Sequence, residues 1–108
     1  MRKIIKTKWG LEIIFAQEDW FTGSFLEIGL NKKTPYRKAP FTCVYHILNG
    51  SVRVLLNGKL YEFSEGKTLL IREGTKYQLI GIKGVPRLIK IAKVRVENED
   101  YSRAGKHI

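Results

Sequence analysis

Cys43 and His46 are the residues of this chain that look most like a catalytic pair, because a thiol beside an imidazole base is a common arrangement for nucleophilic catalysis. Both fall in the apolar run 41–48, which has the composition of a β-strand. Residues three apart on a strand point to opposite faces of the sheet, so the two side chains cannot form a dyad there. We interpret Cys43 as a small buried residue and His46 as a structural or interface histidine.

Carboxylates are the other candidates for acid–base chemistry. They include Glu12, Glu27, Glu62 and Glu73. No two of them have a spacing that requires them to work together. The residue types therefore favour a protein that is not an enzyme, and an enzyme remains the alternative.

Glycines at a constant interval of eight residues mark the elements that must position these side chains. They are Gly50, Gly58, Gly66 and Gly74. Asn49-Gly50 and Asn57-Gly58 are each the pair favoured in two-residue type I′ hairpin turns, so we expect residues 41–63 to form a three-stranded meander. Further turns are expected at Glu65-Gly66, Glu73-Gly74 and 84–86.

These turns divide the chain into short strands with little or no helix. The expected strands are 11–15, 24–30, 41–48, 51–56, 59–63, 67–72, 76–82 and 87–96. Short strands at this spacing are typical of an all-β sandwich or small barrel.

Two spacings in the chain match sequence motifs of a known family. The first is Thr34-Pro35 followed by Cys43-x6-Gly50, and the second is Gly66-x5-Arg72-x-Gly74-x2-Tyr77-x3-Gly81. With them, residues 23–96 resemble a cupin, the small double-stranded β-helix or jelly-roll family. The resemblance implies a single cupin domain over residues 1–108, with 97–108 as a flexible tail.

The cupin metal ligands are missing from the matching positions. The resemblance places them at Arg37, Ala39, Cys43 and Tyr77, where the family has three histidines and a glutamate. A guanidinium repels a cation, a methyl group cannot coordinate one, and a thiol with a phenol is a poor ligand set for zinc, iron or manganese. The only histidines are His46 and His107, so no other cluster replaces the site. We predict no metal and no other cofactor.

Strand alternation gives an apolar, tyrosine-rich barrel interior. If Cys43 and Tyr77 point inward, so do Tyr45, Ile47 and Leu79, and the neighbouring strands add Val52, Val54, Tyr61, Phe63, Leu69 and Ile71. This interior is either a filled core or a ligand pocket. The pocket would comprise Arg37, Cys43, Tyr45, Tyr61, Phe63 and Tyr77. Arg37 at its mouth would favour an apolar ligand with one carboxylate or phosphate.

The opposite face of the strand 41–48 predicts a protein partner. Val44, His46 and Leu48 point outward there, and such an apolar outer face favours burial against a second subunit. We therefore expect a homodimer. The resemblance extends to the metal-free cupins of the centromere protein C type, which use the domain for dimerisation and have a tyrosine at the position of Tyr77.

Both ends of the chain are similar to one branch of the cupins. The segments 8–14 and 94–103 resemble the opening Trp-Gly-x-Glu and the closing Ile-Arg-x-Glu-Asp-x-Tyr-Gly-Arg of type II mannose-6-phosphate isomerases. The missing metal positions mean that the resemblance does not carry the isomerase activity to this chain.

Composition limits the remaining classes. The chain has 108 residues, a formal net charge of +10 and one cysteine, with no apolar run long enough to span a membrane as a helix. We expect a cytoplasmic protein without disulfide bonds. The charge divides evenly between the two halves, and the basic clusters 2–8 and 32–38 are short. This distribution disfavours nucleic-acid binding, which is retained as an alternative.

The sequence thus predicts a metal-free homodimeric cupin that binds a small anionic, sugar-like molecule or serves in assembly. The first alternative is an enzyme of the sugar-phosphate isomerase or epimerase type that uses Arg37 and the pocket tyrosines. The second alternative is a nucleic-acid-binding protein.

Overall fold

A computed structural model of the chain describes residues 3–93, which form strands and connecting loops with no helix. The strands are β1 (Lys3–Lys6), β2 (Gly10–Gln17), β3 (Phe21–Ile28), β4 (Arg37–Lys38), β5 (Cys43–Leu56), β6 (Lys59–Ser64), β7 (Thr68–Ile71) and β8 (Lys76–Lys93). The all-β prediction is confirmed. Residues 3–93 contain no helix that is long and apolar enough to cross a membrane.

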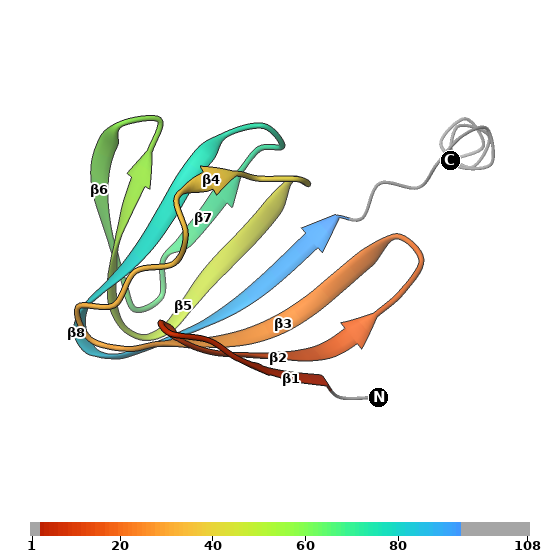
Figure 1. Cartoon of the computed structure of the whole chain (residues 1–108), viewed down its shortest axis with the longest axis horizontal. Coiled ribbons are helices and arrows are strands. Elements are labelled where there is room, and N and C mark those ends of the chain that lie inside the picture. Colours follow the sequence, from red (N-terminus) through yellow and green to blue (C-terminus); the bar gives the residue numbers. More distant parts are fainter. Residues whose placement is uncertain (1–2, 94–108) are drawn as a thin grey trace.

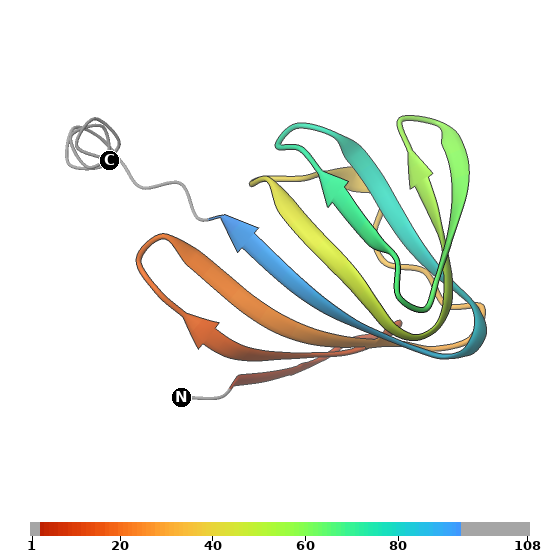
Figure 2. The ribbon, with the colours of Figure 1, turned by 180° about the vertical axis from the view of Figure 1, so that it is seen from behind.

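The long strands β5 and β8 run through two halves of one folded sheet. In the wide half the order is β7-β5-β8-β3-β2-β1, and in the narrow half it is β6-β5-β8-β4. Figure 1 shows the first part of β8 within the narrow half and its last part beside β3. Seen from behind in Figure 2, β6 and β7 lie along opposite ends of β5.

The turn at Asn57-Gly58 is the hairpin that the sequence predicts. Asn57 has φ 46° and Gly58 has φ 88°, and Leu56 pairs with Lys59 on either side of them. Positive φ at both central residues is the geometry of a type I′ turn, which matches the twist of the flanking strands. Turns also occur around Gly66 and Gly74, as expected.

The hairpin predicted at Asn49-Gly50 is wrong, because β5 continues through it. Both halves of β5 pair with β8, and the register shifts between Ile47 and Val52. Gly50 has φ +73°, and a Cβ there would lie 2.5 Å from the Lys83 carbonyl oxygen. The pair therefore forms a bulge, where the absent side chain lets β8 approach closely.

The predicted break at 84–86 is wrong for the same reason. Gly84 has φ +68° inside β8, and a Cβ on it would lie 3.5 Å from the Cα of Gly50. The two irregularities face each other and lie where β5 and β8 pass from one half of the sheet to the other. Pro86 is buried beside them.

The two ends differ from the sequence expectation in different ways. Strand β1 was missed, because four residues with lysines at both ends carry a weak strand pattern. Residues 94–96 of the strand predicted at 87–96, and the tail 97–108, lie outside the described residues, as does Arg2 of the first basic cluster.

The core lies between the two halves of the sheet. Its most deeply buried side chains come from both halves and include Ile28, Ile47, Val52, Val54, Ile71, Leu79 and Leu88. The bulge reverses the side-chain parity of β5, so odd positions point inward before it and even positions after it. This part of the interior is filled by side chains.

Candidate functional site

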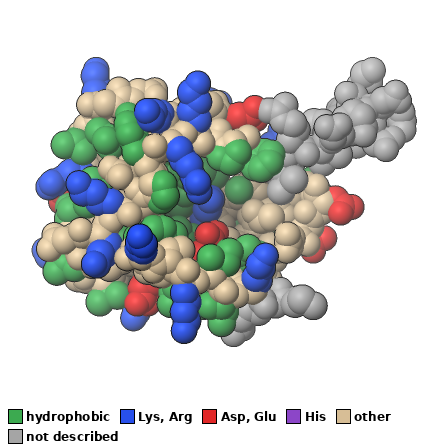
Figure 3. Space-filling model, in the orientation of Figure 1, with side chains coloured by type: hydrophobic (Ala, Val, Ile, Leu, Met, Phe, Trp, Pro, Cys, Tyr) green, Lys and Arg blue, Asp and Glu red, His purple; other side chains and the backbone are tan. Residues whose placement is uncertain are grey.

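A pocket of about 800 Å³ opens where the filled core ends. It lies among the wide half, the β1–β2 loop and the segment that carries β4. Its lining comprises Ile5, Thr7, Lys8, Trp9, Glu12, Leu26, Thr34, Pro35, Arg37, Lys38, Pro40, Tyr45, Tyr77 and Lys90. On the face shown in Figure 3, Lys and Arg side chains gather around a central hollow with a hydrophobic floor. The interior is thus filled in one part and open in another.

Three of the predicted pocket residues line this pocket. Arg37 in β4 is paired with Tyr77 in β8, which brings the guanidinium and the phenol to the same wall. Tyr45 enters from β5, and 98% of its surface is buried. The short pairing of β4 with β8 therefore places Arg37 beside Tyr77 and Tyr45, although the segment around β4 is otherwise a loop.

The other three predicted pocket residues do not line it. Cys43 is buried in the core one inward position before Tyr45. Tyr61 is 45% exposed, because β6 pairs on one side with β5 and forms the end of the narrow half. Phe63 packs partly buried against the core. Strand alternation predicts that these three side chains point inward. It carries no information about how far each residue lies from the pocket opening.

The hydroxyl oxygens of Tyr45 and Tyr77 lie 2.6 Å apart and share a hydrogen bond. Burial raises the pKa of Tyr77 to about 12, and burial also raises the pKa of Tyr45 well above its usual value of 10. Both phenols are therefore protonated at neutral pH. One hydroxyl donates to the other, which leaves one proton of the pair for a further acceptor.

Cys43 lies close to the same two phenols. Burial raises the pKa of its thiol, while the charge of Lys90 and hydrogen bonding with Tyr77 and Tyr45 act in the opposite direction. The thiol is therefore protonated at neutral pH, which fits a structural residue better than a nucleophile. His46 points to the other face of β5 and bonds Thr68 through its Nδ1 at 2.9 Å, so the absence of a Cys43–His46 dyad is as expected.

Sequence reasoning missed four ionisable residues that line the pocket, namely Lys8, Glu12, Lys38 and Lys90. Lys90 in β8 is paired with Tyr45 on one side and with the buried Ser24 on the other. Glu12 in β2 is paired with the buried Leu26. The alternation Leu88-x-Lys90-x-Ala92 was the available signal, because two buried apolar residues flank the lysine at inward positions.

The charge of the pocket wall is mainly positive. Lys8, Arg37, Lys38 and Lys90 contribute four cations, and Glu12 contributes the carboxylate among the lining residues. Trp9 adds an aromatic surface to the same wall. Such a lining combines an apolar floor with polar groups that can orient a small anion.

The positions that correspond to cupin metal ligands are unsuited to a metal. Arg37 is exposed, Ala39 is buried, and Cys43 and Tyr77 belong to the protonated cluster described above. Among residues 3–93, no three His, Cys, Asp or Glu side chains lie close enough together to hold a metal ion. The donor chemistry therefore gives no support for a metal step.

The outer face of the wide half is apolar. One row across its strands is Gly23, Ile91, Val44 and Leu70, and the next row is Phe25, Ile89, His46 and Thr68. Ile91 and Leu70 are 39% and 48% exposed. The ring of Phe15 covers Gly23, where a Cβ would lie 2.9 Å from it. Two of the predicted interface residues, Val44 and His46, belong to these rows, and Leu48 is exposed nearby.

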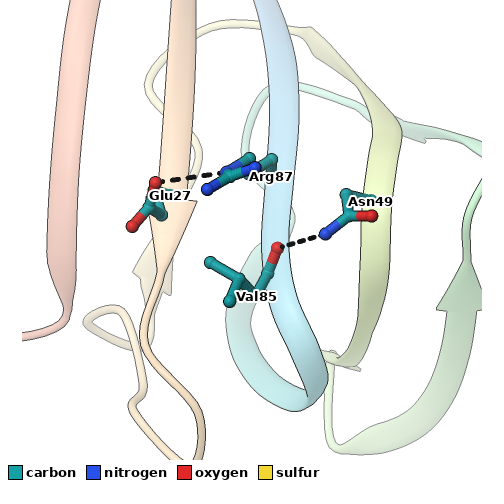
Figure 4. A network of polar contacts seen from close by, with 4 residues as sticks. All are labelled: Glu27, Asn49, Val85 and Arg87. Atoms are coloured by element: carbon teal, nitrogen blue, oxygen red, sulfur yellow. Dashed lines mark hydrogen bonds and ion pairs between the residues drawn. The ribbon is translucent and has the colours of Figure 1, made fainter.

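A polar row borders this apolar outer face. Glu27, Arg87 and Asn49 follow one another across β3, β8 and β5, as Figure 4 shows. Arg87 Nε donates to Glu27 Oε1 at 3.3 Å, and Asn49 Nδ2 donates to the Val85 carbonyl at 3.0 Å. An apolar centre with a polar border is the usual anatomy of a protein interface.

Comparison with known proteins identifies the fold. No sequence-family model and no curated protein matches the chain. Solved structures do match, including KdgF from Halomonas sp., at 12% identity and a TM-score of 0.77, covering 92% of this chain and 90% of that one. An RmlC-like cupin from Shewanella frigidimarina matches at 11% identity and a TM-score of 0.77, with coverage of 94% and 89%.

The polyketide cyclase RemF from Streptomyces resistomycificus has the same fold at 18% identity and a TM-score of 0.75, with coverage of 96% and 87%. The chain therefore has the cupin fold, as the motif spacing predicted. These matches concern the fold, and the similarity of the two ends to type II mannose-6-phosphate isomerases stays a prediction.

Proposed function

We propose that this protein is a homodimeric, cupin-fold binding protein for a small anionic, sugar-like molecule. The observation that carries the proposal is the 800 Å³ pocket, whose lining holds four cations beside one carboxylate. Its volume lies in the range of small-molecule sites in proteins, roughly 300 to 1,000 Å³. Bound ligand would lie on the apolar floor with its anionic group toward the tyrosine pair.

The anionic group would be held by Arg37 and Lys90, which flank the tyrosine pair. Arg37 is close enough to Tyr77, and Lys90 to Cys43, for each charge to favour ionisation of its neighbour. The Lys90 ammonium lies 5.7 Å from the centre of the Tyr45 ring. A guanidinium can bind a carboxylate or phosphate through two parallel hydrogen bonds.

Thermal-shift screening against sugar phosphates, nucleotides and small carboxylates tests this function. A ligand of the pocket raises the melting temperature of the wild-type protein, and Arg37→Ala loses the shift. Arg53→Ala is the matched control, because Arg53 is exposed on β5 outside the pocket lining and should keep the shift. A shift that survives in Arg37→Ala would contradict the assignment.

A second copy of the chain is the proposed occupant of the apolar outer face. The support comes from the apolar row through Val44, from the neighbouring row through His46, and from the polar row that borders them. In a two-fold dimer the same rows of two copies meet, so the patch is buried against itself while Glu27 and Arg87 stay at the border. Soluble monomers rarely expose contiguous apolar patches of more than roughly a few hundred Å².

The enzymatic alternative draws on the neutral tyrosine pair. A sugar-phosphate isomerase or epimerase needs a group that gives up a proton, and a protonated phenol beside Arg37 offers one. Tyr61 cannot serve, since it lies outside the pocket. Incubating a ligand found in the screen in D₂O tests this alternative. Deuterium incorporation that Tyr77→Phe abolishes would favour the enzyme, and no incorporation would favour the binding protein.

A further inference from the structure

Glu12 and Lys90 are ionisable residues on the inner face of the wide half that have no oppositely charged partner. The ion pair that the structure shows within residues 3–93 joins Arg87 and Glu27, and no side-chain hydrogen bond among these residues involves Glu12 or Lys90. Both side chains line the pocket and are partly buried. Charges on the inner face of a sheet lower the stability of the fold. A bound ligand that contacts Glu12 and Lys90 would explain why they are there.

The sheet register keeps the two charges apart. Glu12 is paired with Leu26, and Leu26 with Leu88, so β2 stands two strands away from β8, which carries Lys90. At the usual spacing of neighbouring strands this is about 10 Å across the sheet. The two groups therefore face a common space that a small molecule can span.

The two ends of this space differ in chemistry. Arg37, Lys90 and the tyrosine pair form a donor-rich end, whereas Glu12 supplies a carboxylate acceptor at the β2 side. A ligand that meets both needs an anionic group at one end and a hydrogen-bond donor at the other. Because the lining carries four cations, a neutral hydroxyl fits the donor role better than an ammonium group, which the cations would repel.

Resting on the proposed function, we propose that the ligand is a hydroxylated anion, such as a hydroxy acid or sugar phosphate, whose hydroxyl group donates a hydrogen bond to Glu12 while its anion contacts Lys90 and Arg37. The pocket then selects such molecules over apolar anions of the same shape. A site that bonds a hydroxyl discriminates against the analogue that lacks it, because its own polar group loses its partner.

Calorimetric binding of two matched acids tests the inference. 4-(Hydroxymethyl)benzoate and 4-methylbenzoate share their ring and carboxylate and differ by one hydroxyl group. The wild-type protein should bind the hydroxylated acid roughly tenfold more tightly, the size of one hydrogen bond to a charged group. Glu12→Leu should remove this preference, and Glu62→Leu, on the exposed strand β6, should retain it.

The outcomes separate this inference from the proposed function. If the wild-type protein binds the two acids with equal affinity, selection by Glu12 is overturned. If Lys90→Met then loses the binding of both acids, the anion site itself is retained. A preference that persists in Glu12→Leu would also overturn it. If neither acid binds at millimolar concentration, the anion-binding function itself fails.

Discussion

Tyr45 and Tyr77 join the two halves of the sheet through hydroxyl groups that lie 2.6 Å apart. Tyr45 comes from the part of β5 that belongs to the wide half, and Tyr77 from the part of β8 that belongs to the narrow half. Their rings lie at 59° to each other with centres 6.0 Å apart. Because both phenols remain protonated, the pair closes the pocket floor with hydrogen bonding and without a buried charge.

The tyrosine pair predicts a loss of stability at alkaline pH. The pKa of Tyr77 is about 12 in the folded protein against 10 for a free tyrosine, so between these values the unfolded chain binds fewer protons. The free energy of unfolding contributed by this group is constant below pH 10 and falls by about 1.4 kcal/mol per pH unit as pH rises toward 12. Urea unfolding from pH 8 to 12 measures the fall.

Tyr77→Phe is the control for that titration, since it removes the ionisable hydroxyl and leaves the ring. The variant should show a shallower fall above pH 10 than the wild-type protein. It also leaves Tyr45 without its partner, so its stability at pH 8 should be lower by about 1 kcal/mol. Identical slopes for the two proteins would show that Tyr77 does not titrate as described.

Removing either of two pocket charges should weaken ligand binding without lowering the stability of the fold. Glu12→Leu and Lys90→Met replace ionisable groups on an apolar wall by side chains of similar size, so each variant should unfold at the same or a higher temperature than the wild-type protein. Each should also bind the screened ligand more weakly. A fall of several degrees in the melting temperature of either variant would mean that the charge stabilises the fold.

Cys43 should be unreactive in the folded protein. Its thiol is buried and has a raised pKa, so it offers little thiolate at pH 8. Titration with a chromogenic disulfide reagent should give a slow reaction under native conditions and one equivalent of rapidly reacting thiol in denaturant. Rapid reaction of the native protein would contradict the burial of Cys43.

Gly50 and Gly66 provide a matched pair for the bulge in β5. Both have positive φ, so alanine at either position should cost about 1 kcal/mol from the left-handed backbone alone. Gly50→Ala should cost about 3 kcal/mol or more, because its Cβ would contact the Lys83 carbonyl and Pro86, whereas Gly66 faces open space. Equal losses in chemical unfolding would show that the close approach at the bulge is not tight.

Val44→Arg should convert the proposed dimer into a monomer. Val44 lies in the apolar row between Ile91 and Leu70, where a charge from each copy would be forced into the interface. Light scattering at micromolar concentration measures the mass of wild-type protein and variant. Leu60→Arg, an exposed position on β6 away from this face, should stay dimeric. A monomeric wild-type protein would refute the dimer.

The sequence predicted the strand content and most of the core because short-range patterns carry that information. Asn57-Gly58 makes its hairpin, and Cys43, Tyr45 and Ile47 all point inward as alternation requires. Asn49-Gly50 has the same two residue types and forms a bulge. What decides between them is whether the next segment pairs with its neighbour or with β8, which is a long-range property.

The candidate site was partly predictable for a similar reason. Arg37 and Tyr77 were placed by the motif spacing, which encodes the cupin arrangement of strands. Tyr61 was wrongly predicted to line the pocket, because the distance of a residue from the pocket opening depends on the order of the strands in the sheet. Glu12 and Lys90 come from opposite ends of the chain, on strands β2 and β8, which both pair with β3. They line the same pocket because of this long-range pairing, which local sequence patterns do not encode.

The two tryptophans allow a direct test of the anion-binding pocket. Trp9 lines it, whereas Trp20 is 62% exposed and lies outside its lining. A ¹H–¹⁵N NMR titration with the anion that gives the largest thermal shift should move the Trp9 indole N–H signal and leave that of Trp20 unchanged. Saturable movement of Trp9 alone is the predicted result. Movement of Trp20 with no change at Trp9 would contradict binding in this pocket.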